Sequence, residues 1–432
     1  MTDFLKLWQE IEAAGNIDNY IEKQLVKNGY LVERRDTENM KKSELERYKK
    51  QLKQEAKAKK ELKKKTWLAY KANHIVHLGE GIFWNDGANF DQWDHPRAEE
   101  QASANELPPI DSPKQLAQEM NITIEELRWF TYHRDDAKKI HYRRFTIPKR
   151  SGGERSIWAP LPKLKELQRW VLREIAEKLP IHGSCHGFVA GRSILSNAQV
   201  HCNSHMVVRM DLKDFFPTLT FPRVKGIFRH AGYREQIATL LALVCTEAPR
   251  EVIKHEDELH YISLGPRSLP QGAPTSPALS NIATLKLDRR LSGLVKKLGW
   301  RYSRYADDLT FSLPIGYKKG NSQLGVLLKS VPGIVSDEGF EINRKKTWVA
   351  RKGGRQCVTG LIVNGEQMPR VPRKKQREIR AAIHNLQQGK KLKEGETIEQ
   401  ILGYIAFIYM SQPQKGKELL KKIKSCDLKN KE

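Results

Sequence analysis

The sequence predicts an α+β protein preceded by a mainly helical N-terminal region. At 432 residues with 39% apolar side chains, the chain is long enough for two or three cores. Helical periodicity dominates both ends of the chain, whereas strand-like runs of aromatic and β-branched residues lie between residues 142 and 313. Helices and strands are therefore expected to mix in the middle of the chain.

Charge points to a polyanionic partner. Lys and Arg outnumber Asp and Glu by 76 to 51, which gives a net charge of +25, so nucleic acid is the leading candidate. No apolar run approaches the roughly 20 residues that a membrane span needs, and the N-terminus lacks a signal peptide. The five cysteines form no CxxC pair. We expect a reduced, cytoplasmic protein with no membrane partner.

The N-terminal region contains a highly charged helix. Residues 41–65 are dense in Lys, free of Gly and Pro, and have too few apolar positions for a stripe that faces a core. Two interpretations stay open: a solvated charged helix or a phosphate-binding arm. Residues 79–113 are rich in turn-forming residues, so the N-terminal extension is expected to end near residue 105.

Residues 112–179 predict helices on either side of a hairpin. Two short helices are expected in 112–121 and 123–133, the first with Ser112 as its N-cap and Pro113 in its first turn. Strand-like runs joined by "RSGG" predict a hairpin over 142–160. Apolar residues at helical spacing then predict an amphipathic helix over 164–179.

Three aspartates lie where strands are expected to end. Asp211 follows the apolar strand that starts at Met206. A helix over 282–298 ends at Gly299, and the hairpin that follows has its turn at 306–308, which includes Asp307 and Asp308. If this hairpin pairs with the first strand, three carboxylates meet at one sheet edge. Their repulsion is relieved if they bind two Mg²⁺ ions, and such a site supports phosphoryl transfer.

Six motifs resemble those of reverse transcriptases. "MDLKDFFPTL" at 210–219, "LPQGAPTSPALSN" at 269–281 and "YADD" at 305–308 are similar to the three palm motifs, in the expected order. "IPKRSGGERSIWAP" at 147–160, "LKELQRWV" at 164–171 and "GFEINRKKTWVA" at 339–350 are similar to fingers and late-palm motifs. The resemblance spans about residues 110–420. It implies a right-hand polymerase fold, with fingers, a palm built on an antiparallel sheet and a helical thumb.

The resemblance implies the following domains: an N-terminal extension with a basic helix at 1–105, fingers at 106–205, a palm at 206–360 with a fingers insertion at about 222–265, and a helical thumb at 361–432. The thumb includes the apolar helix "ILGYIAFIYM" between basic ones, and it is expected to clamp the duplex through phosphate contacts.

The resemblance also assigns roles at the polymerase site. The two Mg²⁺ ions would be held by the side chains of Asp211, Asp307 and Asp308 with the Leu212 carbonyl. Phe216 would lie under the sugar and disfavour a 2′-hydroxyl, so that deoxynucleoside triphosphates are selected, whereas Phe215 is the better candidate for the core. The other nucleotide-binding residues implied are Lys149 and Arg155 at the triphosphate, Gln271 and Gly272 at the template and nascent pair, and Lys346 at the pyrophosphate.

Two short motifs resemble those of bacterial retron reverse transcriptases. "SNAQVH" at 196–201 contains the NAxxH pattern, and "VTGLIVN" at 358–364 contains the VTG pattern. The RNA-binding residues implied are Asn197, His201, Val358, Thr359 and Gly360. For His201, a packed polar role stays an equal alternative.

Retron enzymes copy part of their own structured noncoding RNA (msr-msd), primed from a 2′-hydroxyl, into branched RNA-linked DNA (msDNA). The resemblance therefore implies this RNA and its DNA product as partners, an effector protein in antiphage defence, and a host RNase H, since no length is left for an RNase H domain. Two alternatives remain: another bacterial reverse transcriptase, of the group II intron maturase or abortive-infection type, and an inactive RNA-binding scaffold.

Overall fold

The protein has two compact units, Met1–Val76 and His77–Glu432. The computed structural model describes residues 2–38, 40–85, 94–148, 152–317, 320–390, 392 and 395–425. The first unit is helical, with α1 (Thr2–Ala13), α2 (Ile17–Lys27) and α3 (Lys42–Asn73). Helix α3 covers the charged helix predicted at 41–65 and continues for two more turns, which confirms that prediction. Within the described residues, no helix combines the length and the apolar character needed to cross a membrane.

The second unit contains a mixed region whose elements come before and after β4 (Ser204–Asp211) in the sequence. Its helices are α4 (Ala98–Ala104), α5 (Pro113–Glu119), α6 (Ile124–Thr131), α7 (Pro162–Glu174), η1 (Ala176–Lys178), α8 (Ile194–Gln199), α9 (Phe221–Ala231), α10 (Glu235–Cys245) and α11 (Ser276–Ala283). Its strands are β1 (Asp136–Ala137), β2 (Tyr142–Pro148), β3 (Glu154–Pro160), β5 (Arg250–His255) and β6 (Glu258–Ser263).

Several local predictions for this region are confirmed. Strands β2 and β3 pair antiparallel as the expected hairpin, with Ile147 opposite Arg155. Ser112 caps α5, where its side chain accepts a hydrogen bond from the Gln115 amide. The helix predicted over 164–179 is shorter than expected, because the backbone leaves the helical region at Ile175 (φ −126°) and continues as η1.

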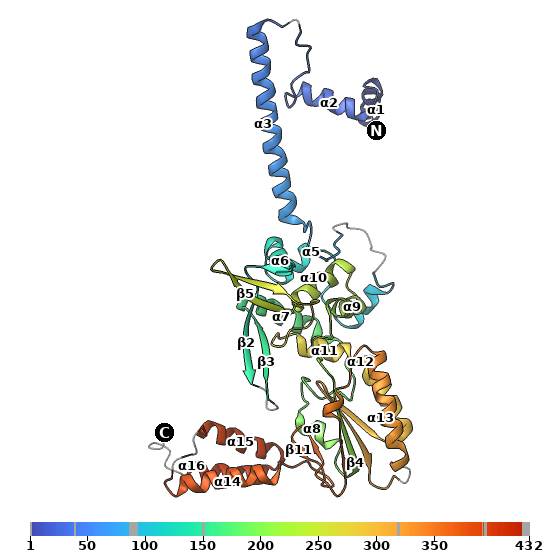
Figure 1. Ribbon diagram of the computed structural model, residues 1–432. Coiled ribbons are helices and arrows are strands. Elements are labelled where there is room, and N and C mark those ends of the chain that lie inside the picture. Colours follow the sequence, from blue (N-terminus) through green and yellow to red (C-terminus); the bar gives the residue numbers. More distant parts are fainter. Residues whose placement is uncertain are drawn as a thin grey trace. The chain divides into compact units, whose positions relative to one another are not determined.

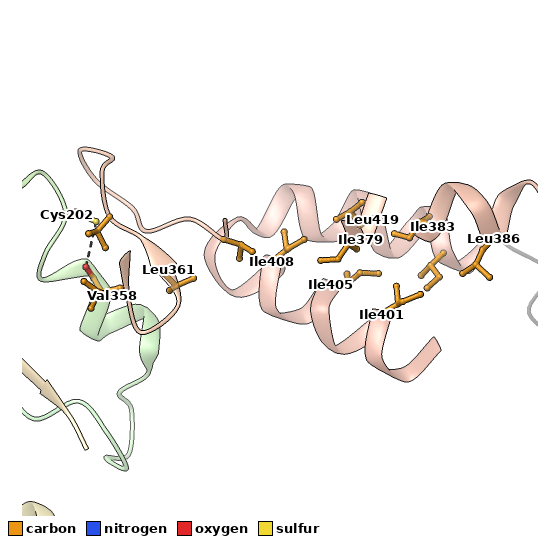
Figure 2. Packing of buried hydrophobic residues seen from close by; sticks show 14 of the residues in the cluster. Cys202, Val358, Leu361, Ile379, Ile383, Leu386, Ile401, Ile405, Ile408 and Leu419 are labelled. Carbon is orange, nitrogen blue, oxygen red and sulfur yellow. Dashed lines mark hydrogen bonds between the residues drawn. The ribbon is translucent and has the colours of Figure 1, made fainter. Parts of the chain in front are cut away.

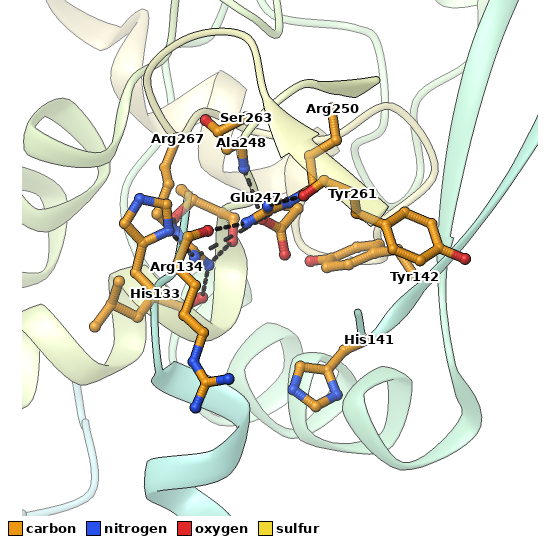
Figure 3. Close-up of polar contacts among 12 residues, drawn as sticks. His133, Arg134, His141, Tyr142, Glu247, Ala248, Arg250, Tyr261, Ser263 and Arg267 are labelled. Carbon is orange, nitrogen blue, oxygen red and sulfur yellow. Dashed lines mark hydrogen bonds and ion pairs between the residues drawn. The ribbon is translucent and has the colours of Figure 1, made fainter. Parts of the chain in front are cut away.

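A buried polar cluster joins α10 to the three-stranded sheet β1–β6–β5 (Figure 3). Glu247 accepts hydrogen bonds from Arg250 at 3.4 Å, and Arg267 Nη1 lies 3.2 Å from His133 Nδ1. Arg250 also donates to the carbonyl oxygens of Arg134 and Tyr261. These contacts satisfy most of the buried donors, so the cluster stabilises the base of the β5–β6 hairpin.

The second unit also contains a four-stranded antiparallel sheet in the order β7–β8–β4–β9 (Figure 1). Its elements are β4 (Ser204–Asp211), α12 (Leu285–Leu298), β7 (Arg301–Tyr305), β8 (Asp308–Pro314), α13 (Gly320–Asp337), η2 (Arg344–Lys346) and β9 (Trp348–Arg351). Helix α12 ends at Gly299 in the left-handed conformation, as predicted, and contacts both β7 and α13.

The two faces of this sheet differ in chemistry because side chains alternate along each strand. Tyr302 and Arg304 point to the face covered by α12, where both contact Asp288; we name this the helix face. Ser303 and Tyr305 point to the opposite face. Since cross-strand partners share a face, Asp308 lies with its partners Tyr305 and Asp211. We name this side the carboxylate face.

The chain ends in a small hairpin and a three-helix bundle. The elements are β10 (Cys357–Val358), β11 (Leu361–Ile362), α14 (Arg373–Gln387), α15 (Ile398–Ser411) and α16 (Pro413–Lys424). Figure 2 shows Ile379 and Ile383 of α14 directed at Ile401, Ile405 and Ile408 of α15. The apolar helix between basic helices is thus confirmed. The same core cluster reaches Val207 of β4 and Val358 of β10, so the bundle is anchored to the four-stranded sheet through the hairpin.

Candidate active site

Strand pairing brings the predicted carboxylates to one end of the sheet. Asp211, the last residue of β4, lies directly opposite Asp308, the first residue of β8. Asp307 occupies the turn between β7 and β8, and its carbonyl oxygen accepts a hydrogen bond of 2.9 Å from the Leu212 amide. All three aspartates are therefore fixed by the backbone ladder rather than by flexible loops.

The turn that carries Asp307 is tight and closely covered. Ala306 has a φ of +55°, an uncommon conformation for a residue other than glycine. Gly187 lies against this turn: a Cβ at Gly187 would be 2.6 Å from the Ala306 amide nitrogen. The Gly187 carbonyl in turn accepts a 2.8 Å hydrogen bond from Asn281 Nδ2. Sequence reasoning missed Gly187, because a glycine next to an aromatic residue carries no signal for a long-range approach.

The negative charges of Asp211, Asp307 and Asp308 outnumber the cations beside them. Burial and the nearby Asp308 and Asp211 carboxylates raise the pKa of Asp307 to about 6. Burial also raises the pKa of Asp308, although Arg209, with Nη2 3.6 Å from its carboxylate, opposes the shift. Lys346 of η2 lies beside Asp211, with its Nζ 2.9 and 3.0 Å from the two carboxylate oxygens. The site thus concentrates negative charge and holds one lysine as its closest counter-ion.

This donor set fits a divalent cation of the Mg²⁺ type. Carboxylate oxygens are the hard ligands that Mg²⁺ prefers, and a cation would relieve the mutual repulsion that raises the pKa of Asp307. Over the ranges that the structure describes, no three His, Cys, Asp or Glu side chains converge as a ready metal cluster. The ligand roles of Asp211, Leu212, Asp307 and Asp308 therefore stay predictions.

The described residues predicted to hold the nucleotide lie on four segments: β3, the stretch after β4, the loop before α11, and η2. Phe215 is buried against Phe340, with ring centroids 5.8 Å apart, whereas Phe216 is only half-buried. Arg155 is exposed on β3. Lys149 lies outside the described residues.

The loop before α11 is attached to the β2–β3 hairpin. The Trp158 amide donates a 2.8 Å hydrogen bond to the Gln271 carbonyl. Gly272 has a φ of +125°, and a Cβ there would lie 2.8 Å from the Trp158 carbonyl oxygen. A side chain at position 272 would thus collide with backbone, which explains the glycine. The predicted contacts of Gln271 and Gly272 with template and nucleotide stay predictions.

Asn197 and His201 are fully buried beneath the carboxylate face. The Ser303 hydroxyl donates its proton to Asn197 Oδ1 at 2.6 Å. Because this proton is already used, Ser303 Oγ accepts a hydrogen bond from His201 Nε2, which lies 2.7 Å away. His201 Nδ1 then accepts from Ser312 at 2.8 Å. Burial, with a smaller effect of Arg301, lowers the pKa of His201 to about 3.

Neither Asn197 nor His201 is exposed in this structure, which favours the packed polar alternative for His201. RNA binding by these two residues stays a prediction. Val358 is likewise buried, and the Thr359 hydroxyl donates to the Ile194 carbonyl at 3.1 Å. Gly360, with a φ of +86°, forms the turn of the β10–β11 hairpin. The VTG hairpin therefore packs against α8, the helix that carries most of the NAxxH motif. Thr359 is half-exposed and Gly360 exposed, so RNA binding by these two residues stays a prediction.

The chain is similar in sequence to known reverse transcriptases. Residues 147–386 match the family described as reverse transcriptase (RNA-dependent DNA polymerase). The chain is 47% identical to the retron Mx162 reverse transcriptase of Myxococcus xanthus over 419 residues, which is 95% of this chain and 86% of that protein. It is 39% identical to the retron Mx65 reverse transcriptase of the same organism over 318 residues, 74% of this chain and 72% of that protein. Among solved structures, telomerase from Candida albicans matches with a TM-score of 0.38 and 12% identity, over 64% of this chain and 54% of that chain.

Proposed function

Because this chain belongs to the retron reverse transcriptases, which are RNA-directed DNA polymerases, we propose that it makes msDNA. It would copy part of a structured noncoding RNA, primed from a 2′-hydroxyl of that RNA, into branched RNA-linked DNA. The right-hand polymerase fold and the polymerase activity follow from family membership. The template, the priming hydroxyl and the product are the proposal.

The observation that supports catalysis best is the register that sets Asp211 opposite Asp308, with Asp307 in the adjoining turn. In the proposed reaction the primer hydroxyl attacks the α-phosphate of a deoxynucleoside triphosphate, and pyrophosphate leaves. Two Mg²⁺ ions held by Asp211, Leu212, Asp307 and Asp308 would activate the attacking oxygen and stabilise the leaving one. The rigid strand ends hold these ligands in place at no reorganisation cost during the reaction.

Other residues would bind and orient the nucleotide. Lys149 and Arg155 at the β2–β3 hairpin would grip the triphosphate, where cations neutralise developing charge. Lys346 would leave Asp211 when metal binds and then protonate or screen the pyrophosphate. Phe216 would exclude a 2′-hydroxyl, and its partial exposure next to the buried Phe215 supports this division of roles. Gln271 and Gly272 would support the template and nascent pair.

The broader assignments are also proposals. We assign 1–105 to an N-terminal extension, 106–205 to fingers, 206–360 to palm with a fingers insertion at about 222–265, and 361–432 to thumb. The core that links Val207 to the C-terminal bundle supports a thumb continuous with the palm. An effector protein in antiphage defence and a host RNase H would complete the system. The four cysteines in the described residues are free, which supports the cytoplasm as the location.

Sequencing the nucleic acid that copurifies with the protein tests this function. Branched RNA-linked DNA is the expected result. Spliced intron RNA would instead favour a group II intron maturase, and RNA without DNA would favour an inactive scaffold. Asp211→Asn should abolish the DNA and leave the RNA, whereas Asp257→Asn, at the exposed tip of the β5–β6 hairpin, should leave both.

A further inference from the structure

Helix α3 gathers seven of its twelve cations on one side. Its 32 residues include twelve Lys and Arg but only four Glu. Seven lysines recur at intervals of three, four or seven residues, which places them on a single face of an α-helix. We name this set the basic stripe: Lys42, Lys49, Lys53, Lys57, Lys60, Lys64 and Lys71. All seven side chains belong to exposed residues.

Another side of α3 is covered by the protein's own chain. The Val32 amide donates a 2.9 Å hydrogen bond to Glu55 Oε2, and Arg34 Nη2 lies 2.8 Å from Glu55 Oε1. The Arg35 amide donates to the hydroxyl of Tyr48, the one buried residue of the helix. These contacts use up one of the four Glu residues of α3 and fix how the helix is rotated about its axis. The stripe is therefore presented away from the segment that covers α3.

The lysines of the basic stripe have no carboxylate partners within the described residues, since none of them forms an ion pair. A solvated helix normally intersperses charges of both signs so that neighbours at i+4 compensate each other. Here the five lysines from Lys49 to Lys64 follow one another at steps of about 5–6 Å along the axis. Two seven-residue steps of about 10 Å separate them from Lys42 and Lys71, and Glu46 lies on the same face in the first of these gaps. The closely spaced lysines from Lys49 to Lys64 fit a row of phosphates.

An exposed aromatic residue continues the stripe. Trp67 falls between Lys64 and Lys71 at the same helical spacing, and the residue is 48% exposed. Lys71 Nζ lies 5.2 Å from the centroid of the Trp67 ring, and the ring stacks on Tyr70 with centroids 5.9 Å apart. A tryptophan beside lysines is a typical platform for an unpaired base. It distinguishes this surface from one that attracts only an acidic protein.

We propose that the basic stripe binds the phosphate backbone of a double-stranded RNA segment and that Trp67 stacks on an unpaired base at its end. The inference rests on the proposed function in one respect: the structured RNA that the enzyme copies supplies the duplex. A straight, rigid helix matches a rigid duplex better than a flexible single strand. Because lysines act as point charges on phosphates, the stripe reads shape and charge rather than sequence. A membrane surface is disfavoured because the exposed leucines of α3, Leu62 and Leu68, lie on different sides of the helix and form no continuous apolar face.

Two triple variants of the full chain test the proposal with the same loss of charge. The first removes three stripe cations: Lys53→Gln, Lys60→Gln and Lys64→Gln. The second removes three cations of α3 that lie off the stripe: Arg47→Gln, Lys59→Gln and Lys65→Gln. Binding to an RNA duplex of about 20 base pairs with a short unpaired end is measured as a function of salt concentration. Circular dichroism checks that both variants fold.

The stripe variant should lower the slope of log affinity against log salt by about 3 and weaken binding about a hundredfold at 0.1 M salt. The off-stripe variant should keep the wild-type slope. Equal losses in both variants, or no loss in either, would overturn the proposal. So would stripe-dependent binding to phosphatidylserine vesicles with RNA binding unchanged. Extension of a primed RNA template by the wild type is measured in parallel, so a failure of polymerase activity is told apart from a failure of the stripe.

Discussion

The two faces of the four-stranded sheet differ in whether their buried charges are neutralised by a partner of opposite charge. On the helix face, Arg304 is fully buried and donates to Asp288 at 2.8–3.1 Å, to Asn281 and to the Ala306 carbonyl. Burial alone would lower the pKa of Arg304, but Asp288 reverses this shift and raises it. On the carboxylate face, Asp307 and Asp308 repel each other and both have a raised pKa.

Arg304 and Asp307 lie three residues apart in the β7–β8 hairpin. The charge of Arg304 stabilises the fold, whereas the charge of Asp307 is assigned to function. A fully satisfied ion pair is costly to break but does no chemistry. Carboxylates held close together without enough cations destabilise the fold, and they are retained where a ligand supplies the missing charge. Each prediction below removes one element of this contrast, from the largest expected effect to the smallest.

Replacing a carboxylate should remove activity. Asp307→Asn keeps the size of the side chain but removes a predicted metal ligand, so we expect DNA synthesis to fall by about a thousandfold or more. Extension of a primed RNA template measures this. The control is Asp257→Asn, which makes the same exchange at an exposed residue in the turn of the β5–β6 hairpin. Near-normal synthesis by the Asp307 variant would contradict the assigned role.

Breaking the pair on the helix face should remove stability. Arg304→Met leaves Asp288 buried without its cation, which should cost about 3–5 kcal/mol of unfolding free energy. Arg209→Met, on the carboxylate face, removes a half-buried arginine from a looser 3.6 Å pair and should cost less than about 1 kcal/mol. Urea unfolding compares the two variants. Similar losses would mean that the faces do not differ as described.

Adding a methyl group behind the catalytic turn should impair activity without touching a carboxylate. In Gly187→Ala the new Cβ would meet the Ala306 amide at 2.6 Å, so the turn must shift. A displacement of this kind should reduce DNA synthesis by about ten- to a hundredfold. Gly183→Ala is the control, because no atom lies within 4 Å of its added Cβ. Equal activity of the two variants would show that the turn tolerates movement.

The buried histidine under the carboxylate face should make the protein sensitive to acid. The pKa of His201 is about 3 in the folded protein and about 6.5 when unfolded, so only the unfolded chain takes up this proton as pH falls below 6.5. Stability is therefore lost on acidification, by up to about 1.4 kcal/mol per pH unit. His201→Gln should unfold with a correspondingly weaker pH dependence between pH 6.5 and 5. If the pH dependence of unfolding is the same in His201→Gln and the wild type, His201 is not the group that takes up the proton on unfolding.

The sequence predicted local features better than long-range ones. The β7–β8 turn, the Ser112 cap and the Gly299 C-cap depend on residues close together in the chain, and all three were predictable. Strands β5 and β6 were not predicted, because their charged, weakly alternating sequences become strands through pairing with each other and with β1.

Long-range packing limited the site prediction as well. The spacing of NAxxH places Asn197 and His201 on one side of a short helix, but it does not show whether that side meets RNA or Ser303 and Ser312. Burial depends on contacts about a hundred residues away in sequence, which a single sequence does not reveal. Gly187 was missed for the same reason.

The central claim is that repulsion among the carboxylates lowers the free energy of unfolding, and that bound divalent cations restore it. It is tested most directly by the unfolding midpoint of the wild type and Asp307→Asn, each measured with EDTA and with Mg²⁺. In EDTA the variant should be more stable than the wild type, on the order of 1 kcal/mol, because burial and repulsion no longer act on a charged Asp307. Mg²⁺ should stabilise the wild type and have little effect on the variant. A variant that is less stable in EDTA, or that gains as much from Mg²⁺ as the wild type, would contradict the account.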